Sequence, residues 1–226
     1  TEEDFMRRTT GFVLGIVLMA AIAALPALAQ KAAPAGTKEA MAVVDKMIEA
    51  MGGRKTLESI KDTTISGTAE AVEYGLTVPL TIYQKEPDKV RIDITIAEAN
   101  MTIIQAYDGQ KGWATNPQTG ATEEMPDFMT KEMARQAAET QAILYPQKTG
   151  VTYALKPKAA IEGKDYIALE QTRADGHKTT YYLDPDTYLP YKTETRTIDQ
   201  YGAEVDSESY SANYQKVGGT MVPYSL

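Results

Sequence analysis

The chain offers few residues for nucleophilic or metal chemistry. It has no cysteine, and its one histidine, His177, follows the turn pair Asp175-Gly176. A zinc site of the His/Cys kind cannot form from these residues, and a Cys–His or Ser–His–Asp catalytic set would have to use His177. The adjacent turn signal predicts a solvent-exposed histidine instead. We therefore expect no metal site and no cofactor.

Carboxylates are plentiful, and two of them at a suitable separation could catalyse hydrolysis. Glu123 and Glu124 precede a predicted helix, and Asp184, Asp186 and Asp199 lie at predicted turns or strand ends. Solvated positions explain such residues, and no spacing selects a pair. A carboxylate hydrolase stays an alternative, but the preferred prediction is that the chain is not an enzyme.

The composition favours binding of apolar groups. The chain has 10 methionines, whose flexible and polarisable side chains suit a surface that accepts varied apolar shapes. The alternative, that these methionines fill the core between helices and sheet, stays open. A net charge of −8 argues against nucleic acid as a partner.

The first 30 residues have the pattern of a cleavable signal peptide. Met6-Arg7-Arg8 precedes an apolar run over residues 12–25, and small residues follow up to a predicted cleavage site after Ala29. The run is shorter than the roughly 20 residues that a membrane-spanning helix needs. Residues 1–5 precede the expected initiator methionine. We therefore predict a periplasmic protein.

The remaining chain predicts one domain behind a short leader. Residues 30–36 are small and polar and contain proline, which is typical of a flexible leader. Residues 37–226 suffice for one domain with a sizeable core. The last residues, 220–226, begin a strand pattern and stop, so we expect the domain to be truncated at its C-terminus.

Two segments have helical periodicity. Met41, Val44, Ile48 and Met51 form one apolar stripe, which Gly52-Gly53 ends, and a short helical turn is expected over 54–60. A second helix is predicted over residues 127–145, with Pro146 ending it.

The other segments alternate with period two between turn residues, which predicts about ten antiparallel strands. They are residues 63–72, 77–86, 89–96, 101–107, 111–115, 151–155, 164–172, 178–183, 189–198 and 208–217. The fold class is mainly β (α+β): a curved antiparallel sheet that forms an incomplete β-barrel covered by α-helices. An apolar ligand could lie between the sheet and the helices.

Several turn motifs carry a family resemblance. The stretch 85–91 and the spacing D-G-x-x-x-W-x-x-N-P over residues 108–117 come first, and a later hairpin over 183–190 follows. With these motifs, residues 37–226 resemble the LolA-like family of periplasmic outer-membrane lipoprotein-sorting carriers. Carriers of this family place an arginine just before the proline of the early turn, whereas this chain has Glu86 there.

The resemblance implies a monomeric carrier without a cofactor, which holds the acyl chains of a lipoprotein or lipid in an apolar cavity. It also implies an inner-membrane donor and an outer-membrane acceptor as partners. An envelope sensor or protein-interaction module with the same fold is the alternative function.

On this hypothesis, hydrophobic residues of the strands form the cavity wall and those of the two helices form a lid. The predicted wall residues are Ile82, Ile92, Ile94, Ile96, Ile103, Trp113, Ile167 and Leu169. The predicted lid residues are Met41, Val44, Ile48, Met51, Met129, Met133 and Leu144.

Overall fold

The computed structural model describes residues 35–71, 76–97, 100–198 and 202–226, which all belong to one unit, Ala33–Leu226. The predicted signal peptide, its cleavage site and Asp199 lie outside the described residues. Ala35 and Gly36 end the predicted leader and lie against residues of a strand, where the amide of Tyr153 donates to the carbonyl oxygen of Ala35 at 2.7 Å.

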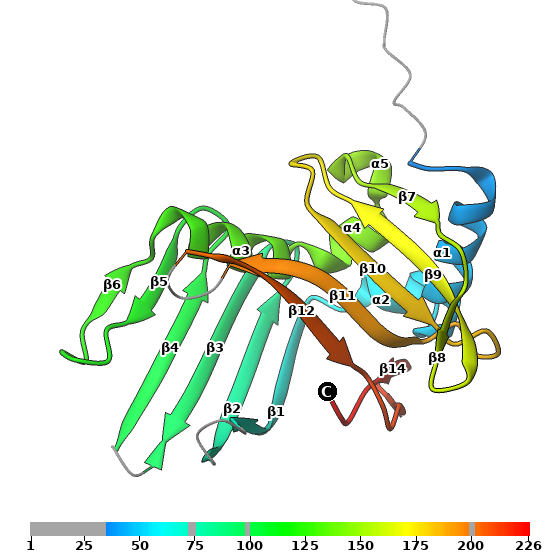
Figure 1. Ribbon diagram of the computed structural model, residues 1–226. Helices are drawn as coiled ribbons and strands as arrows, with labels where there is room; N and C mark the ends of the chain where they lie inside the picture. Colours follow the sequence, from blue (N-terminus) through cyan, green and yellow to red (C-terminus); the bar gives the residue numbers. More distant parts are fainter. Residues whose placement is uncertain (1–34, 72–75, 98–99, 199–201) are drawn as a thin grey trace, which may run out of the picture. The chain divides into compact units, whose positions relative to one another are not determined.

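The first half of the unit is an antiparallel sheet, sheet 1, in which each strand pairs with the next along the chain (Figure 1). Its strands are β1 (Asp62–Ala71), β2 (Leu76–Lys85), β3 (Lys89–Ile96), β4 (Met101–Tyr107), β5 (Gly112–Thr115) and β6 (Thr122–Glu124). The predicted turn at Asp108-Gly109 joins β4 to β5, and the Asp108 carboxylate accepts from the amides of Gln110 and Lys111. Such local bonds fix the hairpin register.

The second half forms another antiparallel sheet, sheet 2, with the strand order β12-β11-β10-β9-β7 and with β8 paired to β9. Its strands are β7 (Thr152–Leu155), β8 (Ala159–Ile161), β9 (Lys164–Thr172), β10 (Lys178–Leu183), β11 (Pro190–Ile198) and β12 (Glu204–Tyr210). A hairpin of β13 (Gln215–Val217) and β14 (Thr220–Val222) follows.

The helices precede sheet 1 and connect the two sheets. They are α1 (Lys38–Ala50), α2 (Arg54–Ser59), α3 (Asp127–Ala137), α4 (Glu139–Leu144) and α5 (Pro146–Thr149). The helix predicted over 127–145 is interrupted at Ala138, whose φ of −91° and ψ of 8° leave the helical geometry. Pro146 begins α5 because proline is tolerated in the first helical turn.

The predicted fold class is confirmed: the unit is mainly β, with antiparallel sheets that are not closed into a barrel. The strands divide into two main sheets because three helices stand between β6 and β7. The strand predicted over 208–217 is divided between β12 and β13. The sequence prediction missed β6 and β8, which have three residues each and are too short to show an alternation.

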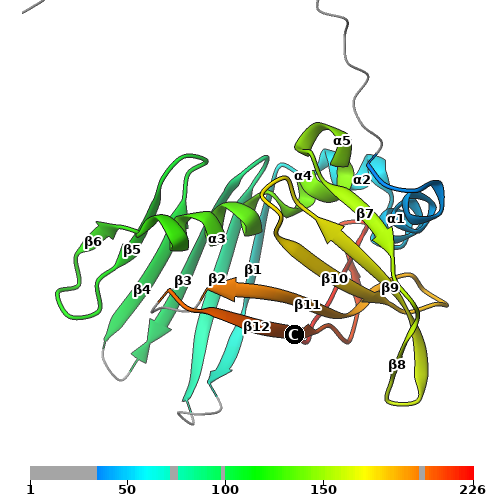
Figure 2. The same ribbon diagram turned by 45° about the horizontal axis from the view of Figure 1, so that its top comes forward.

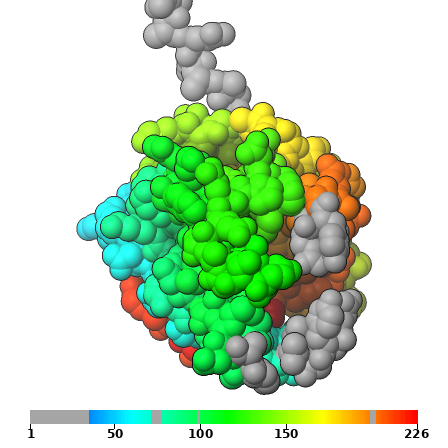
Figure 3. All heavy atoms as spheres, turned by 90° about the vertical axis from the view of Figure 1, so that its left-hand side faces the viewer, coloured from blue at the N-terminus to red at the C-terminus, as the bar shows by residue number. Residues whose placement is uncertain are grey.

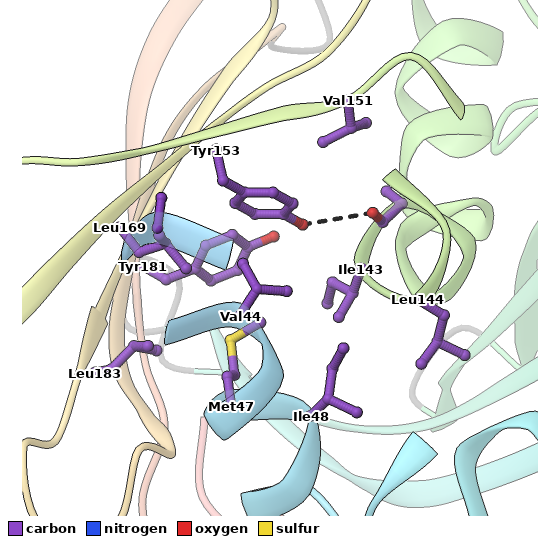
Figure 4. Close-up of a cluster of buried hydrophobic side chains, with 12 residues drawn as sticks. Val44, Met47, Ile48, Ile143, Leu144, Val151, Tyr153, Leu169, Tyr181 and Leu183 are labelled. Carbon is purple, nitrogen blue, oxygen red and sulfur yellow. Dashed lines mark hydrogen bonds between the residues drawn. The ribbon is translucent and has the colours of Figure 1, made fainter. Parts of the chain in front are cut away.

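The main core lies between sheet 2 and the helices α1 and α4 (Figure 4). Val44, Met47 and Ile48 of α1 point toward Leu169 and Leu183 of sheet 2 and toward Ile143 of α4, as Figure 4 shows. All of these side chains are buried. Burying one such side chain contributes about 1.5–3 kcal/mol, so this core fixes α1 and α4 on sheet 2.

A substitution at Leu169 tests this core. Leu169 is 0% exposed, so Leu169→Ala should lower the free energy of unfolding by about 2–5 kcal/mol in urea denaturation. Its register partner Leu155 is 40% exposed, and Leu155→Ala should cost about 0.5 kcal/mol or less. Equal losses in the two variants would contradict the described core.

Candidate functional site

Helix α3 lies across sheet 1 and also reaches sheet 2, since it contacts β3, β4, β5 and β11 (Figures 1 and 2). Met125 and Met133 pack with Val90 of β3 in a second, smaller hydrophobic cluster. A Cβ at Gly112 would lie 2.8 Å from Oγ1 of Thr130, so the absence of a side chain at Gly112 helps the start of α3 to approach β5 closely.

A cavity of about 670 Å³, here called the inter-sheet cavity, lies between α3, sheet 1 and sheet 2. Most apolar lining residues come from sheet 1, α3 and the residues just before α3, where polar side chains lie among them, and the lining from sheet 2 and α4 is mainly polar. The lining residues are Gln84, Ile92, Gln105, Met125, Met129, Glu132, Met133, Arg135, Gln136, Glu139, Arg173, His177, Thr179, Thr195, Thr197 and Ile198.

Hydroxyl groups dominate the wall that sheet 2 contributes. Thr195 and Thr197 alternate along β11 and share one face, and Thr179 is the register partner of Thr195 on β10. The Thr195 hydroxyl donates to the carbonyl oxygen of Lys178 at 3.0 Å and lies 2.9 Å from Nε2 of His177. The Thr179 and Thr195 hydroxyl oxygens lie 3.3 Å apart, so these side chains and His177 form one polar cluster.

His177 and Asp175 lie in the turn between β9 and β10, beside Arg135 of α3. Burial and the nearby Arg135 guanidinium lower the pKa of His177 below its ordinary value. Burial acts to raise the pKa of Asp175, but the amide of His177 and the guanidinium of Arg135 outweigh burial and hold this pKa below its ordinary value. Nε and a terminal nitrogen of Arg135 bind Asp175 Oδ2 at 3.1 and 3.0 Å, and Arg135 also pairs with Glu132.

Glu139, the first residue of α4, joins the helices to sheet 2. Its carboxylate accepts from Nε2 of Gln171 at 3.0 Å and from the Tyr181 hydroxyl, and it forms an ion pair with Arg173. Burial, followed by the Glu139 charge, raises the pKa of Tyr181 well above its ordinary value, so the hydroxyl keeps its proton and donates. The break between α3 and α4 is thereby held on sheet 2.

A second cavity, of about 760 Å³, adjoins the first and is here called the charged cleft. It shares Glu132, Arg135, His177, Thr195 and Ile198 with the inter-sheet cavity. Its further residues come from the turn between β9 and β10 and from β10, β11 and β12. Figure 3 looks at this side of the unit, where the green atoms of β4 to α3 lie beside the orange atoms of β11 and β12.

Of the predicted wall residues, Ile92 lines the inter-sheet cavity. Ile82 is its register partner and packs against the smaller cluster, whereas Ile94, Ile96 and Ile103 lie on the same face of sheet 1 but are not among the lining residues. Trp113 pairs with Ala106, whose partner is Arg91, so the register places Trp113 on the opposite face. Ile167 and Leu169 belong to the main core.

The predicted lid residues are divided between the two helical layers. Met129 and Met133 of α3 line the inter-sheet cavity. Met41, Val44, Ile48, Met51 and Leu144 lie in the main core or pack against it. Helix α3 therefore covers the cavity, whereas α1 fills the space above sheet 2.

Sequence reasoning missed the polar wall of the cavity. His177 was expected to be exposed at a turn, but it is half-buried because α3 lies beside that turn. The sequence did carry a signal of this polar wall. Thr193, Thr195 and Thr197 alternate with charged residues along β11, so one face of the strand carries hydroxyl groups instead of apolar or charged side chains.

No group of three or more His, Cys, Asp or Glu side chains among the described residues is arranged to hold a metal ion. None of the helices in that part of the chain is long and apolar enough to span a membrane.

No protein-family model matches the chain, and no curated protein matches it in sequence. The solved structures similar to this chain include three proteins. A LolA superfamily protein from Nitrosomonas europaea has a TM-score of 0.52 and 17% identity, over 81% of this chain and 82% of that chain. A DUF1329 family protein from Desulfovibrio piger has a TM-score of 0.50 and 15% identity, over 83% of this chain and 84% of its own. A putative outer membrane lipoprotein-sorting protein domain from Vibrio parahaemolyticus has a TM-score of 0.49 and 18% identity, over 82% of this chain and 83% of its own.

At these identities the likeness shows the fold alone. The chain has a LolA-like fold, as its turn motifs predicted.

Removal of the Glu139 carboxylate should loosen the attachment of the helices to sheet 2. Glu139→Ala leaves Arg173, which is 13% exposed, without its charge partner. The expected loss of unfolding free energy in urea is about 2–4 kcal/mol, somewhat below that of a fully buried pair because the Glu139 side chain is 35% exposed. Glu132→Ala is the matched control, because its partner Arg135 keeps an ion pair with Asp175. A loss of unfolding free energy in Glu132→Ala as large as that in Glu139→Ala would contradict this role of Glu139.

The lowered pKa of His177 predicts a dependence of stability on pH. Below an ordinary pKa of about 6.5 the unfolded chain binds a proton that the folded protein still excludes, so folded stability falls as pH drops from 7 toward the folded-state pKa. In urea denaturation between pH 7.5 and 5.5, the unfolding free energy of His177→Gln should fall less steeply with decreasing pH. The difference in slope should correspond to at most one proton. An unchanged slope in the variant would refute the assignment to His177.

Proposed function

We propose that the protein is a non-enzymatic carrier that binds the acyl chains of lipoproteins or lipids in the inter-sheet cavity. The observation that carries the proposal is the wall of Ile92, Met125, Met129 and Met133 facing this cavity of about 670 Å³. Cavities of about 300–1,000 Å³ with apolar walls commonly bind small ligands. The methionines can adjust to the shape of a hydrocarbon chain.

The energetics favour binding of this kind. An acyl chain in water exposes apolar surface at a cost of about 25 cal/mol per Å², and contact with the apolar wall removes part of that cost. Because the sheets do not close into a barrel, a ligand can enter and leave without unfolding of the main core. A carrier needs both properties.

The signal-peptide pattern and the LolA-like fold support the rest of the proposal. On this view the mature protein acts in the periplasm, takes its cargo from a donor at the inner membrane and delivers it toward the outer membrane. Glu86 stands where carriers of the family have an arginine, and its carboxylate accepts from Nε2 of Gln141 in α4 at 2.6 Å. That hydrogen bond attaches the turn after β2 to α4. In cargo release, Glu86 would therefore not take the role that an arginine has at this position.

A second function is favoured by one observation. The space between sheet 2 and the helices α1 and α4 is filled by side chains, as expected for a sensor or protein-interaction module with the same fold. Such a module would bind a protein partner and carry no lipid.

Purification from the periplasm followed by native mass spectrometry and lipid extraction separates the two functions. A carrier should co-purify with a lipid or lipoprotein, or take up a fluorescent acyl lipid when supplied with one. A protein that is empty and takes up none would overturn the carrier proposal.

Substitutions that fill the cavity should block uptake. Ile92→Trp and Met129→Trp each add a large ring to the apolar wall and should weaken binding of a lysophosphatidylcholine with a fluorescent chain by tenfold or more. Lys131→Trp, on the exposed side of α3, is the control and should bind as the unmodified protein does. Unchanged binding in both cavity variants, with folding verified by circular dichroism, would place the ligand elsewhere.

A further inference from the structure

On the basis of the proposed function, we infer that the preferred cargo is an amphiphile with a single hydrocarbon chain and a head group that is not anionic. The chain lies in the inter-sheet cavity, and the head group lies in the charged cleft. The inference rests on the volume of the cavity, the asymmetry of its walls and the ion pairs of the cleft.

The volume admits one long chain. A methylene group occupies about the same volume as a water molecule in the liquid, about 30 Å³. The inter-sheet cavity of about 670 Å³ therefore holds roughly 20 such groups. One chain of 16 or 18 carbons fills most of that volume.

The lining of the cavity also favours a single hydrocarbon chain. The apolar side chains Ile92, Met129 and Met133 gather on the side of sheet 1 and α3, whereas the facing side carries mainly polar groups, such as Thr195 and Thr197. A single chain can lie along the apolar side. A second chain would have to cover polar side chains of the facing side, among them Glu139 and Arg173, and burying charged groups under hydrocarbon is unfavourable.

The head group reaches the charged cleft because the two cavities share Arg135, His177 and Thr195. Six carboxylates line the cleft, against three lysine or arginine side chains and Lys192, which pairs with Glu194 and Glu208 of the six. A negative charge placed in this cleft is repelled on balance.

Each basic side chain of the cleft is already ion-paired. Arg135 binds Glu132 and Asp175, and Lys178 lies 3.2 Å from a Glu170 oxygen. Arg196 lies 3.5 Å from Glu204 and 3.1 Å from Asp206. A phosphate or carboxylate would have to compete with these partners, whereas a cationic, zwitterionic or uncharged head group would not.

The test compares ligands at monomeric concentrations by native mass spectrometry and fluorescent-probe displacement. They are hexadecyltrimethylammonium, palmitoyl lysophosphatidylcholine, palmitate, dipalmitoyl phosphatidylcholine and a triacyl lipopeptide. We expect one molecule of either of the first two to bind per protein, with palmitate at least threefold weaker than hexadecyltrimethylammonium at low salt. This difference should shrink in 0.5 M salt, because the charges of the cleft are near solvent.

Variants of the cleft test the head-group site separately. Glu204→Gln with Asp206→Asn removes two exposed carboxylates and frees Arg196, and it should shift relative affinity toward palmitate by about two- to fivefold. Glu70→Gln with Asp165→Asn removes the same charge at exposed positions outside the cleft and should leave the ratio unchanged.

The outcomes separate the inference from the proposed function. If the two-chain lipid or the lipopeptide bound as tightly as the single-chain ligands or tighter, or if palmitate were preferred, the inference would be overturned. The proposed function as a lipid carrier would still stand. An equal shift in both double variants would overturn the assignment of the head group to the cleft. Binding of none of the five ligands would overturn both proposals.

Discussion

The contacts of Glu139 with sheet 2 determine where the helical layer lies. Glu139 follows the break at Ala138 and is bound by side chains of β9, β10 and the residue after β9. At its other end α3 approaches β5 closely, which Gly112 permits. Helix α3 is therefore attached to sheet 2 at one end and to sheet 1 at the other. Beneath α3, Met125 and Met133 pack with Val90 of sheet 1, and the space that remains faces threonines and paired charges of sheet 2 and its turn.

The two helical layers consequently have different roles. The first, α1 with α4, buries large side chains against sheet 2 and supplies stability. The second, α3, covers a cavity whose apolar side chains gather on the side of α3 and sheet 1 and whose facing side is mainly polar. Such a lining suits a ligand that has both an apolar and a polar part, and the adjoining charged cleft extends the polar side to solvent. The proposed carriage of an amphiphile follows from this division.

Much of the fold could be predicted from the sequence, because period-two patterns such as that of residues 89–96 and turn pairs such as Asp108-Gly109 depend on local chemistry. The LolA-like fold was predictable for the same reason. The site was less predictable. Which strand faces meet across a cavity depends on contacts between distant residues, and Trp113 shows that a shift of one residue reverses the face. The break at Ala138 carries no proline or glycine, so only the packing of the helices on both sheets reveals it.

The most direct measurement is photo-crosslinking with a lysophosphatidylcholine whose acyl chain carries a diazirine, followed by mass spectrometry of the peptides. The account predicts crosslinks on the peptides that contain Ile92, Met129 and Met133, at one molecule per protein. Crosslinks confined to α1, or to the face of sheet 1 that carries Trp113, would contradict it.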